Sequence, residues 1–379
     1  MTKKLSIVAI GFIAGIALGV FLLYFKANPP QHIKAAPRQI IGFLPYWLLN
    51  KAKTNYAGDI TTLTYFALTV GPDGHIVKLA SPQQEEPGWY ALNSGKLNPF
   101  FANARENNIK LSLAIESGDA QAINKMVDKP VQSANNLIAD SLPLMKKYHF
   151  QDLNLDIEDY AYASQKEQTN FTQFIKTIKQ QLRNKKLGAL TIEINPNDAI
   201  TLNLINIKAI APYVDNIVVM AYDYHSPSSL VTGAIAPQTG AGIDASYDVT
   251  TTIEKTLQLA PSGKVILGVP LYGYEWETLS NAIHSAVIPG TAETASNSRM
   301  QSFLSSCATC NVFFDNEAQE AYVTYKDQTS GAYHQIFFPT QQSVQSKIAL
   351  AKKEQLGGIG LWALGYEGSD MLTPLSRYK

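Results

Sequence analysis

Eight short apolar runs recur along the chain from residue 39 onward, and segments whose apolar residues have helical spacing separate them. Their near-continuous Val, Ile and Leu content is typical of strands that are buried on both faces, as parallel strands are. Regular alternation of such strands with helices predicts an α/β fold with a parallel sheet, and eight units predict a (β/α)8 TIM barrel. The runs are residues 39–47, 59–70, 109–115, 150–158, 189–195, 214–222, 264–272 and 357–364.

The interval between the seventh and eighth runs is far longer than the others. Residues 311–338 within it have the pattern of short strands joined by a turn at "DQTSG". We therefore expect a small β-rich insertion, at about residues 277–340, on the loop after the seventh strand. The chain's two cysteines, Cys307 and Cys310, lie in this interval. Their Ser/Thr-rich flanks favour a local disulfide, with free thiols or a redox pair as alternatives.

An uncharged apolar run, residues 5–25, precedes the predicted barrel. As a helix it would extend about 31 Å, which is close to the thickness of the hydrocarbon core of a bilayer. It is longer than the apolar region of a cleaved signal peptide, and Lys3 and Lys4 before it favour a cytoplasmic N-terminus. We predict a membrane-anchored protein whose barrel is extracytoplasmic; a cleaved signal and a secreted protein are the alternative. The predicted parts are a cytoplasmic N-terminus (1–4), a transmembrane signal anchor (5–25), a linker (26–39) and the catalytic barrel (40–379).

The charge balance bears on the class of partner. The 31 basic and 31 acidic residues give a formal net charge of +0, and no run of Lys and Arg is longer than two. A nucleic-acid surface requires a basic excess or a basic patch, so no nucleic-acid partner is expected. No cluster of metal-ligand type and no phosphate-binding loop is present, so we expect neither a metal nor another cofactor.

The fourth run, "FQDLNLDIEDY", carries polar residues at every second position: Asp152, Asn154, Asp156 and Glu158. Side chains of a strand alternate between its two faces, so these four share one face. An acidic strand is usually a solvated edge or the start of a helix, but a barrel strand has a solvated face only at the barrel mouth. Catalytic groups of such barrels lie at the C-terminal ends of the strands, where Asp156 and Glu158 fall. We therefore predict a catalytic role for both.

This strand resembles the D-x-x-D-x-D-x-E strand of glycoside hydrolase family 18, the chitinase-like hydrolases. Gln151 and Asn154 stand where the family has its first two Asp residues, while Asp156 and Glu158 match the last two acidic positions. The late stretch from Val323 is similar to the subgroup that acts on bacterial cell walls and spore cortex. Other segments match in the family's order: "GFLPYW" (42–47), "VVMAYDYH" (218–225), "GVPLYG" (268–273) and "GGIGLWALG" (357–365).

The resemblance implies a retaining glycosidase that cleaves β-1,4-linked N-acetylglucosamine-containing glycans, either peptidoglycan or chitin and its oligosaccharides. In this family the acetamido oxygen of the substrate itself attacks the anomeric carbon. By that resemblance Glu158 is the general acid, Asp156 accepts a hydrogen bond from the acetamide N–H, and Tyr222 donates one to the acetamide oxygen. Asn154 replaces a carboxyl of the family's strand and can hydrogen-bond Asp156, but it cannot take a proton.

The resemblance also implies a substrate-binding set around these catalytic residues. Trp362 would form the floor under the sugar, and further polar and aromatic side chains at strand ends would line the cleft: Asp223, Met220, Tyr46, Tyr224 and Tyr272. Packing is the alternative for Trp362, Met220 and each aromatic residue. Five more residues are expected at or near the strand ends of the mouth, where they could contact substrate: Trp47, Tyr274, Trp276, Glu116 and His225. His334 is expected to be structural.

An alternative class is a catalytically silent, lectin-like barrel of the same family. Such relatives lack the proton donor, and the presence of Glu158 favours an enzyme. We expect a monomer whose partners are a polysaccharide that contains N-acetylglucosamine and, through the N-terminal helix, a membrane.

Overall fold

A computed structural model describes residues 38–158, 163–201, 203–240, 247–307 and 310–378. The predicted anchor at residues 5–25 lies outside the described residues, as does nearly all of the linker. Within the ranges just given, no helix is both long enough and apolar enough to cross a membrane.

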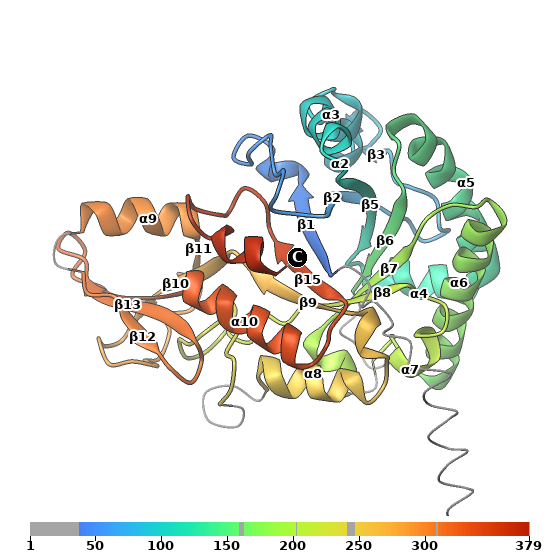
Figure 1. Ribbon diagram of the computed structural model, residues 1–379. Coiled ribbons are helices and arrows are strands. Elements are labelled where there is room, and N and C mark those ends of the chain that lie inside the picture. The colour runs from blue at the N-terminus through green and yellow to red at the C-terminus, as the bar shows by residue number, and fades with distance from the viewer. Residues whose placement is uncertain (1–37, 159–162, 202, 241–246, 308–309, 379) are drawn as a thin grey trace, which may run out of the picture. The chain divides into compact units, whose positions relative to one another are not determined.

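Eight parallel strands form a closed barrel in the order β1-β15-β9-β8-β7-β6-β5-β2 (Figure 1). Each of the eight apolar runs of the sequence overlaps one of them, which confirms the predicted barrel. The strands are β1 (Gln39–Pro45), β2 (Thr62–Thr69), β5 (Lys110–Ser117), β6 (Asp152–Ile157), β7 (Leu190–Ile194), β8 (Asn216–Val219), β9 (Val265–Pro270) and β15 (Gly358–Trp362).

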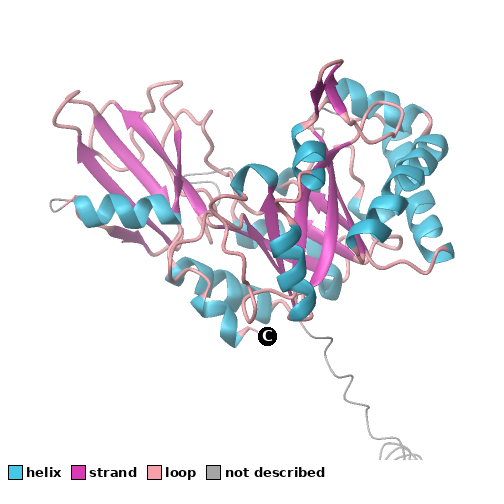
Figure 2. Cartoon of the chain, turned by 90° about the horizontal axis from the view of Figure 1, so that it is seen from above, coloured by secondary structure: helices cyan, strands magenta, loops and turns pink. Residues whose placement is uncertain are grey.

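Helices cover the outside of the barrel, as the view from above shows (Figure 2). Helix α6 (Gln165–Asn184) illustrates why: the Ser164 side chain accepts a hydrogen bond from the Glu167 N–H at its start, and Phe171 and Phe174 bury one face. The other covering helices are α2 (Pro87–Asn93), α3 (Asn98–Glu106), α4 (Ala120–Asp128), α5 (Pro130–Tyr148), α7 (Ile207–Ile210), α8 (Val249–Leu257) and α10 (Gln341–Lys353). Short elements complete this part of the chain: η1 (Tyr46–Leu48), β3 (Leu79–Ser81), β4 (Gln84–Glu85), η2 (Pro196–Ala199), η3 (Ser262–Lys264) and η4 (Thr373–Arg377).

The barrel interior is packed rather than open. Residues of β1, β2, β5, β8 and β9 form one buried cluster, which includes Ile41, Phe43, Phe66, Ala114, Val218 and Ile266. Gly268 on β9 makes room beside it, because a Cβ there would lie 2.5 Å from the Val219 carbonyl oxygen and 3.0 Å from the Tyr222 ring. The apolar cluster therefore fills the interior of the barrel beneath the mouth.

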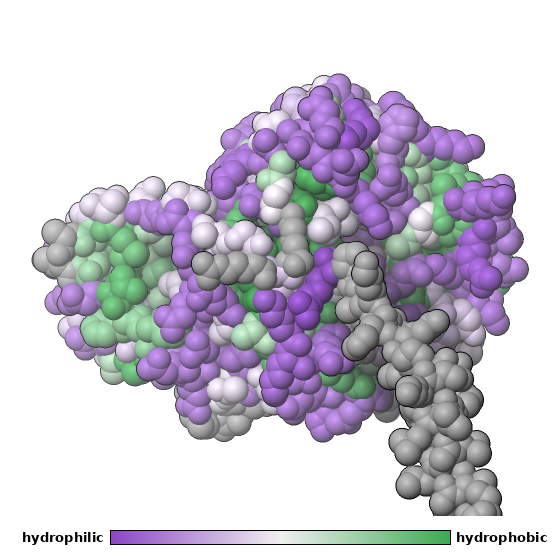
Figure 3. Space-filling model, in the orientation of Figure 1, coloured by the Kyte–Doolittle hydropathy of each residue, from purple (hydrophilic) through white to green (hydrophobic). Residues whose placement is uncertain are grey.

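A five-stranded antiparallel sheet lies between barrel strands β9 and β15, in the order β11-β10-β14-β13-β12. It begins at Tyr272, earlier than the residue 277 expected from the sequence, because the chain passes from β9 into β10 almost at once. Helix α9 (Asn297–Ser306) packs on one face, and Cys307 and Cys310 after it form a disulfide. Apolar side chains gather over this insertion (Figure 3). Its strands are β10 (Tyr272–Thr278), β11 (Glu293–Ser296), β12 (Phe313–Asp315), β13 (Glu320–Lys326) and β14 (Tyr333–Phe338).

Candidate active site

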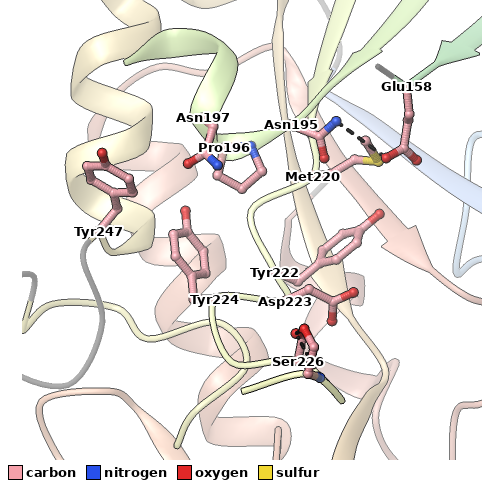
Figure 4. A pocket seen from close by; sticks show the side chains of 11 residues that line it. Glu158, Asn195, Pro196, Asn197, Met220, Tyr222, Asp223, Tyr224, Ser226 and Tyr247 are labelled. Atoms are coloured by element: carbon pink, nitrogen blue, oxygen red, sulfur yellow. Dashed lines mark hydrogen bonds between the residues drawn. The ribbon is translucent and has the colours of Figure 1, made fainter. Parts of the chain in front are cut away.

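A cavity of about 560 Å³ opens at the C-terminal ends of β6, β7 and β8 (Figure 4). Catalytic groups of this fold gather at that end of the barrel. The cavity is lined by Glu158, Asn195, Pro196, Asn197, Met220, Tyr222, Asp223, Tyr224, Ser226, Ser228 and Tyr247.

Glu158 lies at one end of this cavity, directly after β6. Its backbone N–H donates to the Ser117 carbonyl oxygen at 2.9 Å, which extends the pairing of β5 and β6 to residue 158. The Asn195 side-chain amide donates to Glu158 Oε2 at 3.3 Å, and Met220 lies beside the same carboxyl (Figure 4). Glu158 is half-buried, so its carboxyl can reach a molecule in the cavity while one oxygen is held in place.

Two further carboxyls lie beneath Glu158 inside the barrel. Asp156 on β6 is 5% exposed and Glu193 on β7 is 2% exposed. Burial raises the pKa of Asp156, and the carboxylates of Glu193, Glu158 and Glu116 and a hydrogen bond with Glu158 raise it further. Burial and the Glu158 charge also raise the pKa of Glu193. Both carboxyls are therefore harder to ionise than in water, and no basic side chain is among the groups that act on either of them in the described residues.

Tyr222 and Asp223 enter the site from the end of β8. Burial and the acids around it, Glu193 first, raise the pKa of Tyr222, which keeps its hydroxyl a hydrogen-bond donor. Asp223 has a φ of 60°, a left-handed conformation that is uncommon outside glycine. Its Oδ1 accepts hydrogen bonds from the hydroxyls of Tyr272 at 2.6 Å and Tyr274 at 3.2 Å. These bonds fix the carboxyl, and strained residues of this kind are often functional.

An aromatic group stands at the ends of β15, β1 and β2. Trp362 is half-buried and lies edge-on to Phe66, with ring centroids 4.7 Å apart. It also contacts Phe43 and the exposed Trp47. Trp362 does not line the 560 Å³ cavity, and its role as a sugar platform stays a prediction.

Five of the side chains predicted from the sequence line the cavity together: Glu158, Met220, Tyr222, Asp223 and Tyr224. Asp156 and Asn154 lie buried beneath it, and Tyr272 supports Asp223 from behind. Tyr46 instead lines a separate cavity of about 210 Å³ with Tyr90.

Four other residues that the sequence singled out do not line this cavity. Glu116 accepts a hydrogen bond from the Thr69 hydroxyl at 2.6 Å on β2. Trp276 is fully buried in the insertion. His225 is buried against Gly233, where an added Cβ would lie 2.3 Å from its ring. His334, as expected for a structural residue, bonds Glu275 of the insertion sheet.

The sequence reasoning missed several residues of the site. Glu193 lies inside the apolar run "ALTIEIN", where its only signal is one acid at an inward-facing position of a buried strand. The others lie in the segments after β7 and β8. Polar residues are also common in ordinary turns, so in these segments they gave no specific signal of a site. These loop residues are Asn195, Pro196, Asn197, Ser226, Ser228 and Tyr247.

The charges of the lining limit what the cavity can hold. It contains two carboxyls, Glu158 and Asp223, and no Lys, Arg or His side chain among the residues that line it. In the part of the chain that the structure describes, no group of three or more His, Cys, Asp or Glu residues could hold a metal ion. The arrangement provides an acid at a polar cleft, tyrosine hydroxyls as donors and buried carboxyls beneath, which suits proton transfer to a bound neutral molecule.

Comparisons with known proteins agree with this geometry. The sequence model described as Glycosyl hydrolases family 18 matches residues 39–367. The chain is 25% identical over 349 residues to the putative sporulation-specific glycosylase YdhD of Bacillus subtilis strain 168, covering 89% of this chain and 75% of that protein. The next two curated relatives, from Drosophila melanogaster, are longer, and the chain spans 12% and 56% of them.

Two solved structures share the fold. The group IV chitinase of Ostrinia furnacalis in complex with allosamidin superposes with a TM-score of 0.76 at 21% identity, over 90% of this chain and 97% of that one. The spore cortex-lytic enzyme SleL of Bacillus megaterium QM B1551 superposes with a TM-score of 0.72 at 19% identity, over 92% of this chain and 75% of that one.

Proposed function

The chain belongs to glycosyl hydrolases family 18 and is a glycosidase, and we propose that it cleaves β-1,4-linked N-acetylglucosamine-containing glycans with retention of configuration. The observation that carries the proposal is one cavity in which Glu158 and Tyr222 face the same space, above the buried Asp156. A lectin-like barrel is not favoured, because the proton donor is present and held at the cavity by Asn195.

The proposed reaction uses the acetamido group of the substrate as nucleophile. Glu158 protonates the leaving glycosidic oxygen while the acetamido oxygen attacks the anomeric carbon, which forms a cyclic oxazolinium intermediate. Asp156 accepts the hydrogen bond of the acetamide N–H and stabilises the positive charge, and Tyr222 orients the acetamide oxygen. Glu158 then takes a proton from water, which opens the ring and retains the configuration.

The substrate that we propose is uncharged where it is cut. A lining with two carboxyls and no cation disfavours a sugar that carries a carboxylate and suits neutral N-acetylglucosamine. The sporulation glycosylase and cortex-lytic enzyme among the similar proteins support a bacterial cell-wall glycan, and the chitinase supports chitin or its oligosaccharides. An extracytoplasmic barrel held by residues 5–25, which we also propose, would bring the site to a cell-envelope glycan.

The test compares acetylated, deacetylated and glucose oligomers of equal length, with the full chain in detergent. Only the acetylated oligomers should be cleaved, because the other two lack the nucleophile, and NMR of the first product should show the β-anomer. Similar cleavage of all three oligomers would mean that a protein carboxylate is the nucleophile. Binding of acetylated oligomers without cleavage would instead favour the lectin-like alternative.

A further inference from the structure

Asp156 and Glu193 lie at adjacent positions on two neighbouring strands of the barrel. The register of β6 and β7 pairs Leu155 with Ile192, and continuing it by one residue places Asp156 beside Glu193. Both are buried polar residues on the inward face. Asp156 Oδ1 and Glu193 Oε1 each lack a hydrogen-bond partner among the described residues. Asp156 makes its hydrogen bond with Glu158, and Glu193 acts on Asp156 through its charge, so each of the two acids keeps one buried oxygen that can hold a proton.

Asn154 connects the two strands at the next inward position below Asp156. Its side chain hydrogen-bonds Glu193, which by itself lowers the pKa of that carboxyl. An amide can hold a carboxylate in place but cannot accept its proton. The acidic strand therefore lacks a carboxyl at position 154, and the neighbouring strand supplies one at position 193.

The surroundings of this pair are acidic on every side. The titratable groups that face it are Glu116 on β5, Glu158 after β6 and Tyr222 after β8. Neighbouring acids that are buried away from water resist ionising together, and such groups release their protons in coupled steps. None of these neighbours is a cation that could neutralise the pair. A proton retained by the pair would lower its charge and so reduce the cost of burying it.

We propose that Glu193 is a positioning residue that shares one proton with Asp156 and takes it when Asp156 binds the acetamide N–H as a carboxylate. The O–H bond on Asp156 breaks, an O–H bond on Glu193 forms, and the proton returns when product leaves, so no atom or electron is gained or lost. This inference rests on the proposed function, because it assigns Asp156 to the acetamide group.

Two single substitutions should move the pH dependence of kcat/KM in opposite directions. Glu193→Gln removes the neighbouring charge that raises the pKa of Asp156. The acid limb, which is the rise of kcat/KM on the acidic side of the pH profile, should therefore move to lower pH by about one unit. Asn154→Asp adds a carboxyl beside the pair and should move the acid limb to higher pH. A purely structural role for Glu193 would lower stability or rate without moving the limb.

The double variant Asn154→Asp/Glu193→Gln relocates the carboxyl from β7 to β6 without changing the number of carboxyls. Its acid limb should return towards that of the unaltered protein. If the double variant stays where Glu193→Gln alone puts it, or if Glu193→Gln does not move the limb, the proposal is wrong. Should Glu193→Gln fail to fold, Asn154→Asp decides: no shift to higher pH contradicts the proposal.

A readout without turnover separates this inference from the proposed function. Infrared absorption of protonated carboxyls, followed during a pH titration of the full chain, should show a band that titrates at lower pH in Glu193→Gln. Glu320→Gln, a matched change of a buried glutamate in the insertion, removes a different protonated carboxyl, because burial raises the pKa of Glu320 to about 7, but it should leave the band that shifts in Glu193→Gln and the acid limb where they are. An unaltered band in Glu193→Gln, or an equal shift in Glu320→Gln, would overturn the assignment even if no oligomer is cleaved.

Discussion

Buried carboxyls occur in two regions of the molecule, and the two regions stabilise them differently. In the insertion, Glu320 accepts hydrogen bonds from the backbone N–H groups of Ala236 at 2.8 Å and Ile235 at 3.1 Å. The buried Lys347 of α10 donates to the Ala236 carbonyl oxygen at 2.7 Å, and its charge lowers the pKa that burial raises in Glu320. Glu320 and Lys347 therefore compensate each other.

The barrel mouth has no such compensation. Asp156 and Glu193 are buried like Glu320, yet the groups that act on them are other acids and one amide. Burying a carboxyl without a cation destabilises the folded state unless the group is protonated. The difference is consistent with a structural use of the buried carboxyl in the insertion and with the catalytic use that we propose for the carboxyls of the mouth, which they serve despite their effect on stability. Local sequence rules are often violated at functional sites in this way.

The largest expected effect is on catalysis. Glu158→Gln keeps the hydrogen bond with Asn195 possible but removes the proton donor, so kcat should fall about 10²–10⁴-fold. The melting temperature should change little, because Glu158 is half-buried and not part of the core. Steady-state kinetics on an acetylated oligomer measure this, and a rate within a few-fold of the unaltered protein would remove Glu158 from its role.

In the insertion, a substitution beside the buried carboxyl should affect stability rather than catalysis. Lys347→Met leaves Glu320 buried without its cation, so the free energy of unfolding should fall by about 3–5 kcal/mol. The activity of the protein that remains folded should be kept. Urea unfolding measures the loss, and the double variant Lys347→Met/Glu320→Gln should recover part of it. A loss under about 1 kcal/mol would show that Glu320 does not need Lys347, and the contrast with the mouth would weaken.

Asp223 differs from both regions, because its side chain is exposed at the cavity and two tyrosine hydroxyls hold it without a cation. Tyr272→Phe removes the 2.6 Å hydrogen bond and should lower the free energy of unfolding by about 1–3 kcal/mol. Tyr274→Phe is the matched control, and its 3.2 Å bond should be worth less. Equal losses in the two variants would mean that Asp223 does not depend on the shorter bond.

The fold was predictable because buried parallel strands leave a strong signal. Each apolar run overlaps a barrel strand, and the alternating acids of the fourth run were enough to place the end of that strand at the mouth. The start of the insertion was predicted too late in the sequence. The stretch "GVPLYGYEW" has β-strand character throughout, so the pattern of apolar residues does not show where β9 ends and β10 begins.

The site was only partly predictable. Asp156 and Glu158 could be found because they alternate on one strand, whereas Glu193 reaches the same place from another strand and becomes its neighbour only when the barrel closes. Loop residues such as Asn195 and Tyr247 carry no periodic signal, and which loop covers the mouth depends on tertiary packing. Trp276 was expected near the mouth, but the insertion sheet buries it.

The pH dependence of stability follows from the direction of the pKa shifts at the mouth. The folded state raises the pKa of Asp156 and Glu193, so above the ordinary carboxyl pKa of about 4 it binds more protons than the unfolded chain. These two groups therefore make the free energy of unfolding fall as pH rises through that range. Asp156→Asn removes one of them and should make this fall shallower.

Urea unfolding of the unaltered protein and Asp156→Asn, at neutral pH and near pH 4, tests the central claim most directly. At neutral pH Asp156→Asn should be the more stable protein, by about 1 kcal/mol, and the gain should vanish near pH 4, where the carboxyl is protonated anyway. Its hydrolysis of acetylated oligomers should fall at least about tenfold. An Asp156→Asn protein that is less stable at both pH values would contradict the claim that the mouth keeps its buried carboxyls at the expense of stability.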